Sequence, residues 1–179
     1  MSTPNIYLKP NFLTAPQDLF DLLKKEVIWD ERMCARKTAS FGVAYDYSQI
    51  SYAETEMPQF LQVICKDVEN ELGFLPNNCL LNFYLDGNSS MGFHSDSTDE
   101  LAEGSGVAIV SLGSLRHIAY RSKEDKNQEY FYPLPAGGLL YMSASIQEEW
   151  LHAIPKEPGA GERISLTFRK ILNKARTEP

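Results

Sequence analysis

The sequence contains little that would crosslink the chain or carry it into a membrane. Its three cysteines, Cys34, Cys65 and Cys79, are odd in number and never form a C-x-x-C pair, which excludes a disulfide framework and a cysteine-based zinc knuckle. No stretch approaches 18 uninterrupted apolar residues, and residues 1–9 lack the apolar centre of a signal peptide. We therefore expect a cytoplasmic protein with reduced thiols and no membrane span.

Positive charge is also scarce. The 179 residues include 17 Lys and Arg against 24 Asp and Glu, a formal net charge of −7. Proteins that coat nucleic acid use many Lys and Arg contacts with phosphates, so this balance argues against bulk nucleic-acid binding and leaves only local basic patches. A hydrophobic content of 43% with 23% charged residues is typical of globular chains, and the length favours one domain spanning residues 1–179, expected to be a monomer.

Two segments have the apolar spacing of amphipathic helices. Thr14 and Gln17 form a capping-box pattern, and the apolar residues that follow predict a helix over residues 15–27. A second apolar stripe predicts a helix over residues 58–72, which Gly73 would end. Cys65 lies on that stripe and is expected to pack in the core.

After Gly73 the sequence changes to short alternating runs separated by Gly, Pro, Asn and Asp, which is typical of strands and turns. Eight strands are predicted, at residues 79–85, 91–96, 107–112, 116–121, 129–134, 138–143, 150–153 and 163–171. Two helices before such a run favour an α+β jelly roll, with residues 1–75 as helical support on one sheet and residues 76–172 as the core.

Only three histidines are present, and two of them fit a metal site. His94 and Asp96 are two residues apart, so in an extended strand both side chains would point to the same face. His152 would complete a set of two histidines and one carboxylate, which suits non-haem Fe(II) oxygenases. The alternative is ordinary: His94 as a surface-turn residue and His152 as an interior histidine with one hydrogen bond. The third histidine, His117, is expected to be structural, because no metal-spaced partner accompanies it.

Polar residues alternate with apolar ones along two predicted strands. Those of the last strand are Arg163, Ser165, Thr167 and Arg169, and those of residues 79–85 are Asn82 and Tyr84. Arginine forms paired hydrogen bonds with carboxylates, so two arginines near a metal site indicate a small dicarboxylic acid as co-substrate. A polar strand face turned to water would explain the same pattern.

Several motifs occur together in a fixed order. They are N-x-Y-x-D-G from Asn82, H-x-D from His94, SLG from Ser111, W-x-H from Trp150 and R-I-S-L-T-F-R-K from Arg163. In this combination residues 33–172 resemble the AlkB family of Fe(II)- and 2-oxoglutarate-dependent dioxygenases, closest to the members that repair alkylated bases.

The resemblance implies a double-stranded β-helix (jelly-roll) fold that uses Fe(II), 2-oxoglutarate and O2. It implies that His94, Asp96 and His152 bind the iron. It also implies a 2-oxoglutarate site, whose residues are Asn82, Tyr84, Arg163, Ser165, Thr167 and Arg169. The implied reaction is oxidative dealkylation of a nucleobase in DNA or RNA, with release of succinate, CO2 and formaldehyde.

The segment from Arg36 through Tyr45 and Tyr47 resembles the part of the family that covers the base. We expect these three residues to bind substrate, with the tyrosines stacking on an unstacked base or simply packing in a strand. Ser97 and Thr98 follow the metal carboxylate, where repair members usually carry acidic residues, and are expected to contact substrate in their place.

Two other functions remain open from the sequence. The acidic charge and the departure at Ser97 and Thr98 favour a hydroxylase of a small metabolite as the alternative to an enzyme acting on alkylated nucleic acid. A cupin-like metal-binding module without catalytic activity is the second alternative.

Overall fold

The computed structural model describes residues 3–47 and 50–172, and within them twelve strands and three helices. In chain order these are β1 (Ile6–Lys9), α1 (Pro16–Glu26), β2 (Lys37–Gly42), β3 (Tyr45–Tyr47), β4 (Ile50–Tyr52), α2 (Gln59–Leu72), β5 (Asn78–Tyr84), β6 (Met91–His94), β7 (Gly106–Gly113), β8 (Arg116–Ser122), β9 (Glu129–Leu134), β10 (Leu139–Ser143), α3 (Ala144–Glu149), β11 (Trp150–Ile154) and β12 (Arg163–Arg169).

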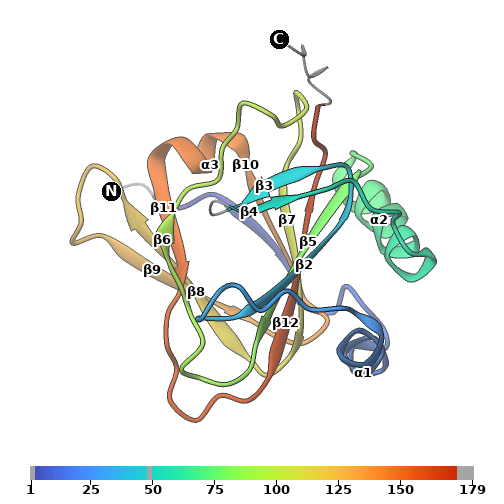
Figure 1. Cartoon of the computed structure of the whole chain (residues 1–179). Coiled ribbons are helices and arrows are strands. Elements are labelled where there is room, and N and C mark those ends of the chain that lie inside the picture. The colour runs from blue at the N-terminus through green and yellow to red at the C-terminus, as the bar shows by residue number, and fades with distance from the viewer. Residues whose placement is uncertain (1–2, 48–49, 173–179) are drawn as a thin grey trace.

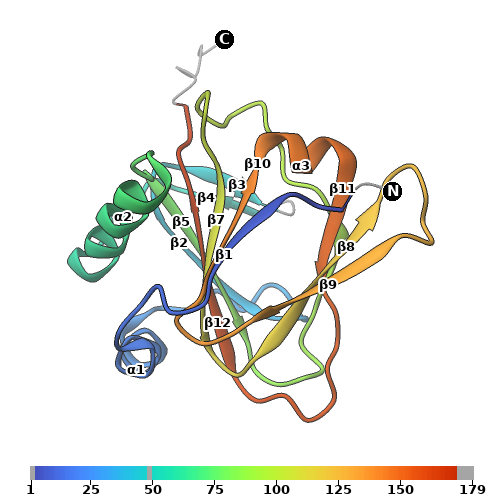
Figure 2. The ribbon, with the colours of Figure 1, turned by 180° about the vertical axis from the view of Figure 1, so that it is seen from behind.

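Two antiparallel sheets face one another to form a double-stranded β-helix. The larger sheet has the order β1-β10-β7-β12-β5-β2, and the smaller has the order β6-β11-β8-β9. Figure 1 shows α1 and α2 on the outer side of the larger sheet, and Figure 2 shows the same layers from behind. The α+β jelly-roll prediction, with helices covering one sheet, is confirmed.

Apolar side chains fill both interfaces. Beneath the helices, Leu23 of α1 and Leu61 of α2 are fully buried against strands of the larger sheet. A second cluster, which includes Ile118 and Trp150, lies on the inner faces of the two sheets. Burial of apolar area at both interfaces stabilises the arrangement of the two sheets.

The helices begin and end close to the predicted residues. Gly73 has a φ of 82° and ends α2 in the left-handed conformation, as its position predicts. The capping box predicted for α1 is wrong: Ala15 occupies the N-cap without a side-chain hydrogen bond, and Gln17 instead donates to Asp21. Pro16 at the first helical position supplies the start, because its φ is already helical and it has no N–H to satisfy.

All eight predicted strands are present, but four N-terminal strands were not predicted. The first 75 residues supply the two edges of the larger sheet, since β1 pairs with β10 and β2 pairs with β5. A further hairpin, β3-β4, forms a separate two-stranded sheet. Among the described residues, no helix is both long and apolar enough to span a membrane.

Strand β12 lies between β5 and β7 in the middle of the larger sheet. Its register places Arg163 opposite Tyr84 and Ser165 opposite Asn82. All seven residues of β12 are buried, so the alternative of a polar face turned to water is wrong. The alternation instead directs one set of side chains to the helices and the other to the space between the sheets.

Gly42 ends β2 just before the hairpin, and its conformation provides a test of this connection. Its φ is 89°, and an added Cβ would lie 2.0 Å from the Asn77 carbonyl oxygen. We expect Gly42→Ala to lower the free energy of unfolding by about 3 kcal/mol or more, because strain and a backbone clash add together. Urea denaturation measures this loss.

Gly159 is the matched control, because its φ is 87° but nothing lies within 4 Å of an added Cβ. Gly159→Ala should cost only about 1 kcal/mol from conformational strain. Equal losses in the two variants would contradict the close packing described for Gly42.

Candidate active site

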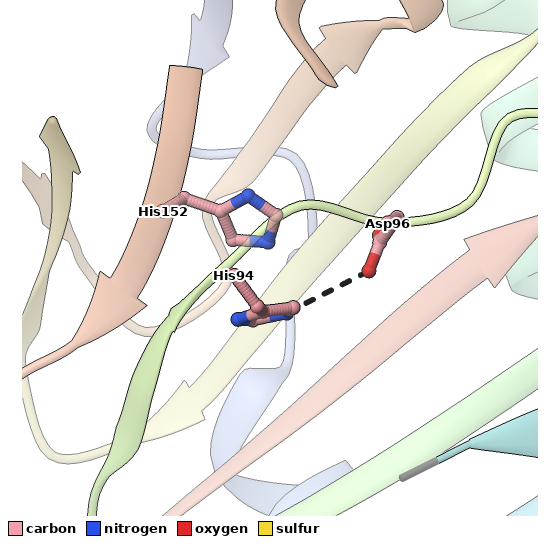
Figure 3. A group of neighbouring side chains, drawn as sticks. All are labelled: His94, Asp96 and His152. Atoms are coloured by element: carbon pink, nitrogen blue, oxygen red, sulfur yellow. Dashed lines mark ion pairs between the residues drawn. The ribbon is translucent and has the colours of Figure 1, made fainter. Parts of the chain in front are cut away.

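Three side chains that ligate metals meet in the space between the sheets. Their donor atoms, from His94, Asp96 and His152, all lie within 4.8 Å of one another. His94 ends β6 and is directly opposite His152 of β11, with ring centroids 4.3 Å apart. Figure 3 shows the two rings and the carboxylate pointing toward one another, with the ion pair between His94 and Asp96.

Asp96 reaches this cluster from a loop rather than from a strand. Strand β6 ends at His94, so the predicted strand over residues 91–96 is too long and strand alternation does not place the carboxylate. The Asp96 N–H instead donates to the Gln147 side-chain oxygen at 2.8 Å. Gln147 belongs to the short helix α3 and is buried, and its type and position in the sequence gave no signal of this role.

A buried ion pair sets the charge of the carboxylate. Arg169 Nη2 lies 2.9 Å from Asp96 Oδ2, and both side chains are less than 5% exposed. Burial alone would raise the pKa of Asp96, but the Arg169 guanidinium, together with His94 and His152, holds it well below its usual range. The carboxylate is therefore ionised before any metal arrives.

The two imidazoles offer nitrogen donors. Burial lowers the pKa of His152 to about 4, so its ring is neutral at pH 7. His94 Nδ1 lies 2.9 Å from the Gly92 carbonyl oxygen, and a proton on Nδ1 would donate to this acceptor and leave Nε2, 3.6 Å from Asp96 Oδ1, to bind a metal. Two imidazoles and one carboxylate are a donor set suited to Fe(II), so the residues fit the metal.

An inner cavity adjoins the three ligating side chains. All six residues predicted to hold 2-oxoglutarate line it, namely Asn82, Tyr84, Arg163, Ser165, Thr167 and Arg169. The strand register explains this convergence, because β5 and β12 are neighbours and turn the same face inward.

The arginines of this cavity have unused donors. Arg163 is fully buried, and its Nη2 donates to Ser111 Oγ at 2.9 Å. Nε and Nη1 of Arg163, and the same two atoms of Arg169, are buried with no hydrogen-bond partner among the described residues. Buried N–H groups are nearly always satisfied, so these four donors indicate an anionic acceptor in the cavity, as a dicarboxylate would supply.

An outer cavity of about 460 Å³ forms the mouth of the site. Of the predicted substrate residues, Tyr45, Tyr47 and Ser97 line it, whereas Thr98 and Arg36 do not. Its remaining lining is Asp46, Met91, Gly92, Phe93, His94, Ser95, Asp96, Glu100, Arg169 and Ile171. Sequence reasoning did not single out Asp46 as a mouth residue.

The two cavities share part of their lining. Both include Tyr47, Met91, His94, Asp96 and Arg169, and the inner one is narrow, at about 20 Å³. Any ligand that fills the inner cavity must therefore contact or displace the side chains at this junction. The Tyr45 and Tyr47 rings are parallel to within 19° with centroids 6.4 Å apart, and Tyr45 also packs on the Arg169 guanidinium.

Arg36 and His117 lie elsewhere than in the mouth. Arg36, predicted to bind substrate, is only 8% exposed and bonds to the buried side chains of Asn82 and Tyr47. His117 Nδ1 faces Glu157 at 3.4 Å and lies outside the group of metal-ligating side chains, which agrees with a structural role.

Comparisons with known proteins agree with this geometry. Residues 8–169 match the family model of the 2OG-Fe(II) oxygenase superfamily. Alpha-ketoglutarate-dependent dioxygenase alkB homolog 3 of Rattus norvegicus is 30% identical over 198 residues, which cover 97% of this chain and 66% of the relative. DNA oxidative demethylase ALKBH2 of Homo sapiens is 33% identical over 148 residues, covering 76% of this chain and 57% of the relative.

The chain therefore spans just under two thirds of the rat relative and little more than half of the human one. Among solved structures, that of OsALKBH1 superposes with a TM-score of 0.73 at 18% identity, covering 95% of this chain and 100% of that chain. At this identity the likeness supports the fold alone.

The buried ion pair predicts a large stability effect. Arg169→Met would leave the Asp96 carboxylate buried without its cation, so we expect the metal-free protein to lose about 3 kcal/mol of unfolding free energy. Urea denaturation at pH 7 in the presence of a chelator measures it.

Lys24→Met is the matched control, because Lys24 pairs with Glu162 at 2.6 Å on the surface. An exposed pair of this kind contributes less than about 1 kcal/mol. Similar losses in both variants would contradict the importance given to the buried pair.

Proposed function

This chain belongs to the AlkB-like 2OG-Fe(II) oxygenases, and we propose that it dealkylates damaged nucleobases by oxidation. It is therefore a dioxygenase, and the alternative of a cupin-like module without catalysis is set aside. The observation that carries the proposal is that three parts of the site adjoin one another. They are a cluster of two histidines and one carboxylate, a cavity lined by guanidinium donors that have no partner, and a mouth lined by aromatic rings and carboxylates.

Each part has a proposed role. His94, Asp96 and His152 hold Fe(II). Arg163 and Arg169 bind the carboxylates of 2-oxoglutarate through their free N–H groups, with Asn82, Tyr84, Ser165 and Thr167 completing the cavity. When bound, iron and 2-oxoglutarate supply the oxidation of a C–H bond by O2, with succinate and CO2 as products.

The protein contributes charge, position and exclusion of water. The Arg169 guanidinium keeps Asp96 ionised and also lines both cavities, so one residue serves the metal side and the co-substrate side. His152 is held neutral by burial, so no proton must leave it when a metal binds at pH 7. The buried inner face keeps bulk water from the reacting groups.

The mouth supports an alkylated base as substrate. Alkylation of a ring nitrogen in adenine or cytosine leaves the base positively charged, and the carboxylates of Asp46 and Glu100 line the mouth together with Tyr45 and Tyr47. Negative charge attracts such a base, and aromatic rings stack on it once it leaves the helix. The net charge of −7 thus fits selection of the damaged base better than extensive contact with phosphates.

We expect the purified protein to convert 2-oxoglutarate to succinate in the presence of Fe(II) and ascorbate. His94→Ala and Asp96→Ala should each reduce this turnover at least about a hundredfold, because loss of one ligand weakens binding of the metal. Quantifying succinate measures the effect, with folding of each variant checked by circular dichroism. His117→Ala is the matched control and should retain activity, and unchanged turnover in both ligand variants would refute the iron assignment.

An oligonucleotide carrying 1-methyladenine or 3-methylcytosine should give formaldehyde. Hydroxylation of the methyl group forms an unstable N-hydroxymethyl group, which releases one formaldehyde for each repaired base. The measurement compares formaldehyde and repaired base with an unmethylated oligonucleotide of the same sequence. Succinate without formaldehyde from either substrate would favour the small-metabolite hydroxylase instead.

A further inference from the structure

Arg36 forms hydrogen bonds with one side chain that lines the inner cavity and with another that lines the mouth. Its Nε donates to Asn82 Oδ1 at 2.8 Å and its Nη2 donates to the Tyr47 hydroxyl at 2.5 Å. A third bond, from Nη1 to the Ser90 carbonyl oxygen at 3.2 Å, fixes the plane of the guanidinium. Arginine presents its donors in a rigid fork, so these three partners are held in one fixed geometry.

The bond to Asn82 determines which way its amide faces. Because the oxygen of the amide accepts from Arg36, the Nδ2 group is the end left for other partners, and no hydrogen bond among the described residues uses it. Asn82 lines the inner cavity. Arg36 therefore turns this amide into a donor for an anion, where the opposite rotamer would present an oxygen and repel it.

The bond to Tyr47 acts on the junction of the two cavities. Tyr47 lines both, and its hydroxyl accepts from Arg36 and donates to Met91 Sδ at 3.2 Å. Burial raises the pKa of Tyr47 to about 12 even though Arg36 opposes this, so the hydroxyl keeps the proton that it donates. Met91 also lines both cavities, so the Arg36 contacts extend to the side chains that a ligand in the narrow inner cavity must meet.

Arg36 also has no carboxylate partner. None of the ion pairs within residues 3–47 and 50–172 includes Arg36, although this residue is only 8% exposed. A buried cation is normally paired, so a purely structural arginine would be expected to have an acidic neighbour. Its partners are instead the two neutral side chains that line the cavities.

We propose that Arg36 is a positioning residue that orients the Asn82 amide toward 2-oxoglutarate and fixes the Tyr47 hydroxyl at the junction of the two cavities. This inference rests on the proposed function, since it takes 2-oxoglutarate as the occupant of the inner cavity. Arg36 touches neither substrate nor metal in this scheme and acts through Asn82 and Tyr47.

The first test is a double-mutant cycle on binding, without turnover. Calorimetry measures 2-oxoglutarate binding to the Zn(II)-loaded protein, whose metal does not react with oxygen. Arg36→Lys keeps the charge but loses the fork, and should weaken binding about tenfold, as should Asn82→Ala. The double variant should be no weaker than Asn82→Ala alone, because both changes remove the same interaction.

Arg32→Lys is the matched control, because Arg32 is an exposed arginine paired with Asp30 and lines neither cavity. It should bind 2-oxoglutarate as the unaltered protein does. If Arg36→Lys does not fold, the pair Tyr47→Phe and Asn82→Ala replaces it in the cycle, and their effects should likewise be less than additive.

The second test observes Tyr47 directly. Fluorine NMR of Zn(II)-loaded protein labelled with 3-fluorotyrosine gives signals from its nine tyrosines, and Tyr47→Phe identifies that of Tyr47 by its loss. Without ligand, this signal should have the same position in the unaltered protein and in Arg32→Lys but a different one in Arg36→Lys, because only that variant loses the bond that fixes the Tyr47 hydroxyl.

The outcomes separate the two proposals. If the unaltered protein binds no 2-oxoglutarate, the proposed function fails and the inference fails with it. If it binds but Arg36→Lys binds equally well, or the effects of Arg36→Lys and Asn82→Ala simply add, only the positioning role is overturned. A Tyr47 signal at the same position in Arg36→Lys as in the unaltered protein would likewise overturn the positioning of Tyr47.

Discussion

The ion pair between Asp96 and Arg169 is the constraint on which the site depends. It joins the loop after β6, which belongs to the smaller sheet, to the end of β12 in the middle of the larger sheet. Two charges removed from water are costly unless they meet in good geometry, so this pair permits little variation in how the sheets face one another. The carboxylate is thereby both ionised and fixed in place, and the two histidines need only approach it from β6 and β11.

The central position of β12 extends this constraint to the inner cavity. Its neighbours β5 and β7 supply Asn82, Tyr84 and Ser111, so Arg163 and Ser165 of β12 lie opposite polar residues, whereas Thr167 lies opposite Leu80 and Ile109. Arg163 and Arg116 both lie near the Tyr84 ring, at 5.1 and 5.6 Å from its centroid. An interior with this much positive charge and so few acidic groups is stable only because aromatic faces and hydroxyls surround the guanidiniums, and it is prepared for a doubly negative ligand.

Much of this was predictable from residue patterns, and the failures have physical causes. Alternation marked the strands after Gly73 because each has one face toward apolar layers, and the chemistry of the two histidines, Asp96 and the arginines marked the site. Strands β1 and β2 gain their order from β10 and β5, partners far along the chain that a local pattern does not contain, and β3 and β4 have only three residues each. The burial of Arg36 beside β2 follows from the pairing of β2 with β5, and the position of Asp96 follows from a bond to Gln147; a local pattern contains neither.

The hairpin β3-β4 pairs with neither of the two large sheets and is joined to β2 through the turn at Gly42, where the Thr55 backbone bonds back to that glycine. It nevertheless carries both mouth tyrosines. The strands that carry the iron-binding cluster therefore do not depend on hairpin pairing, although Tyr45 and Tyr47 pack on Arg169 and Arg36. Exchanging the hairpin with that of a relative while keeping these two tyrosines is a direct route to redesigning what the mouth accepts.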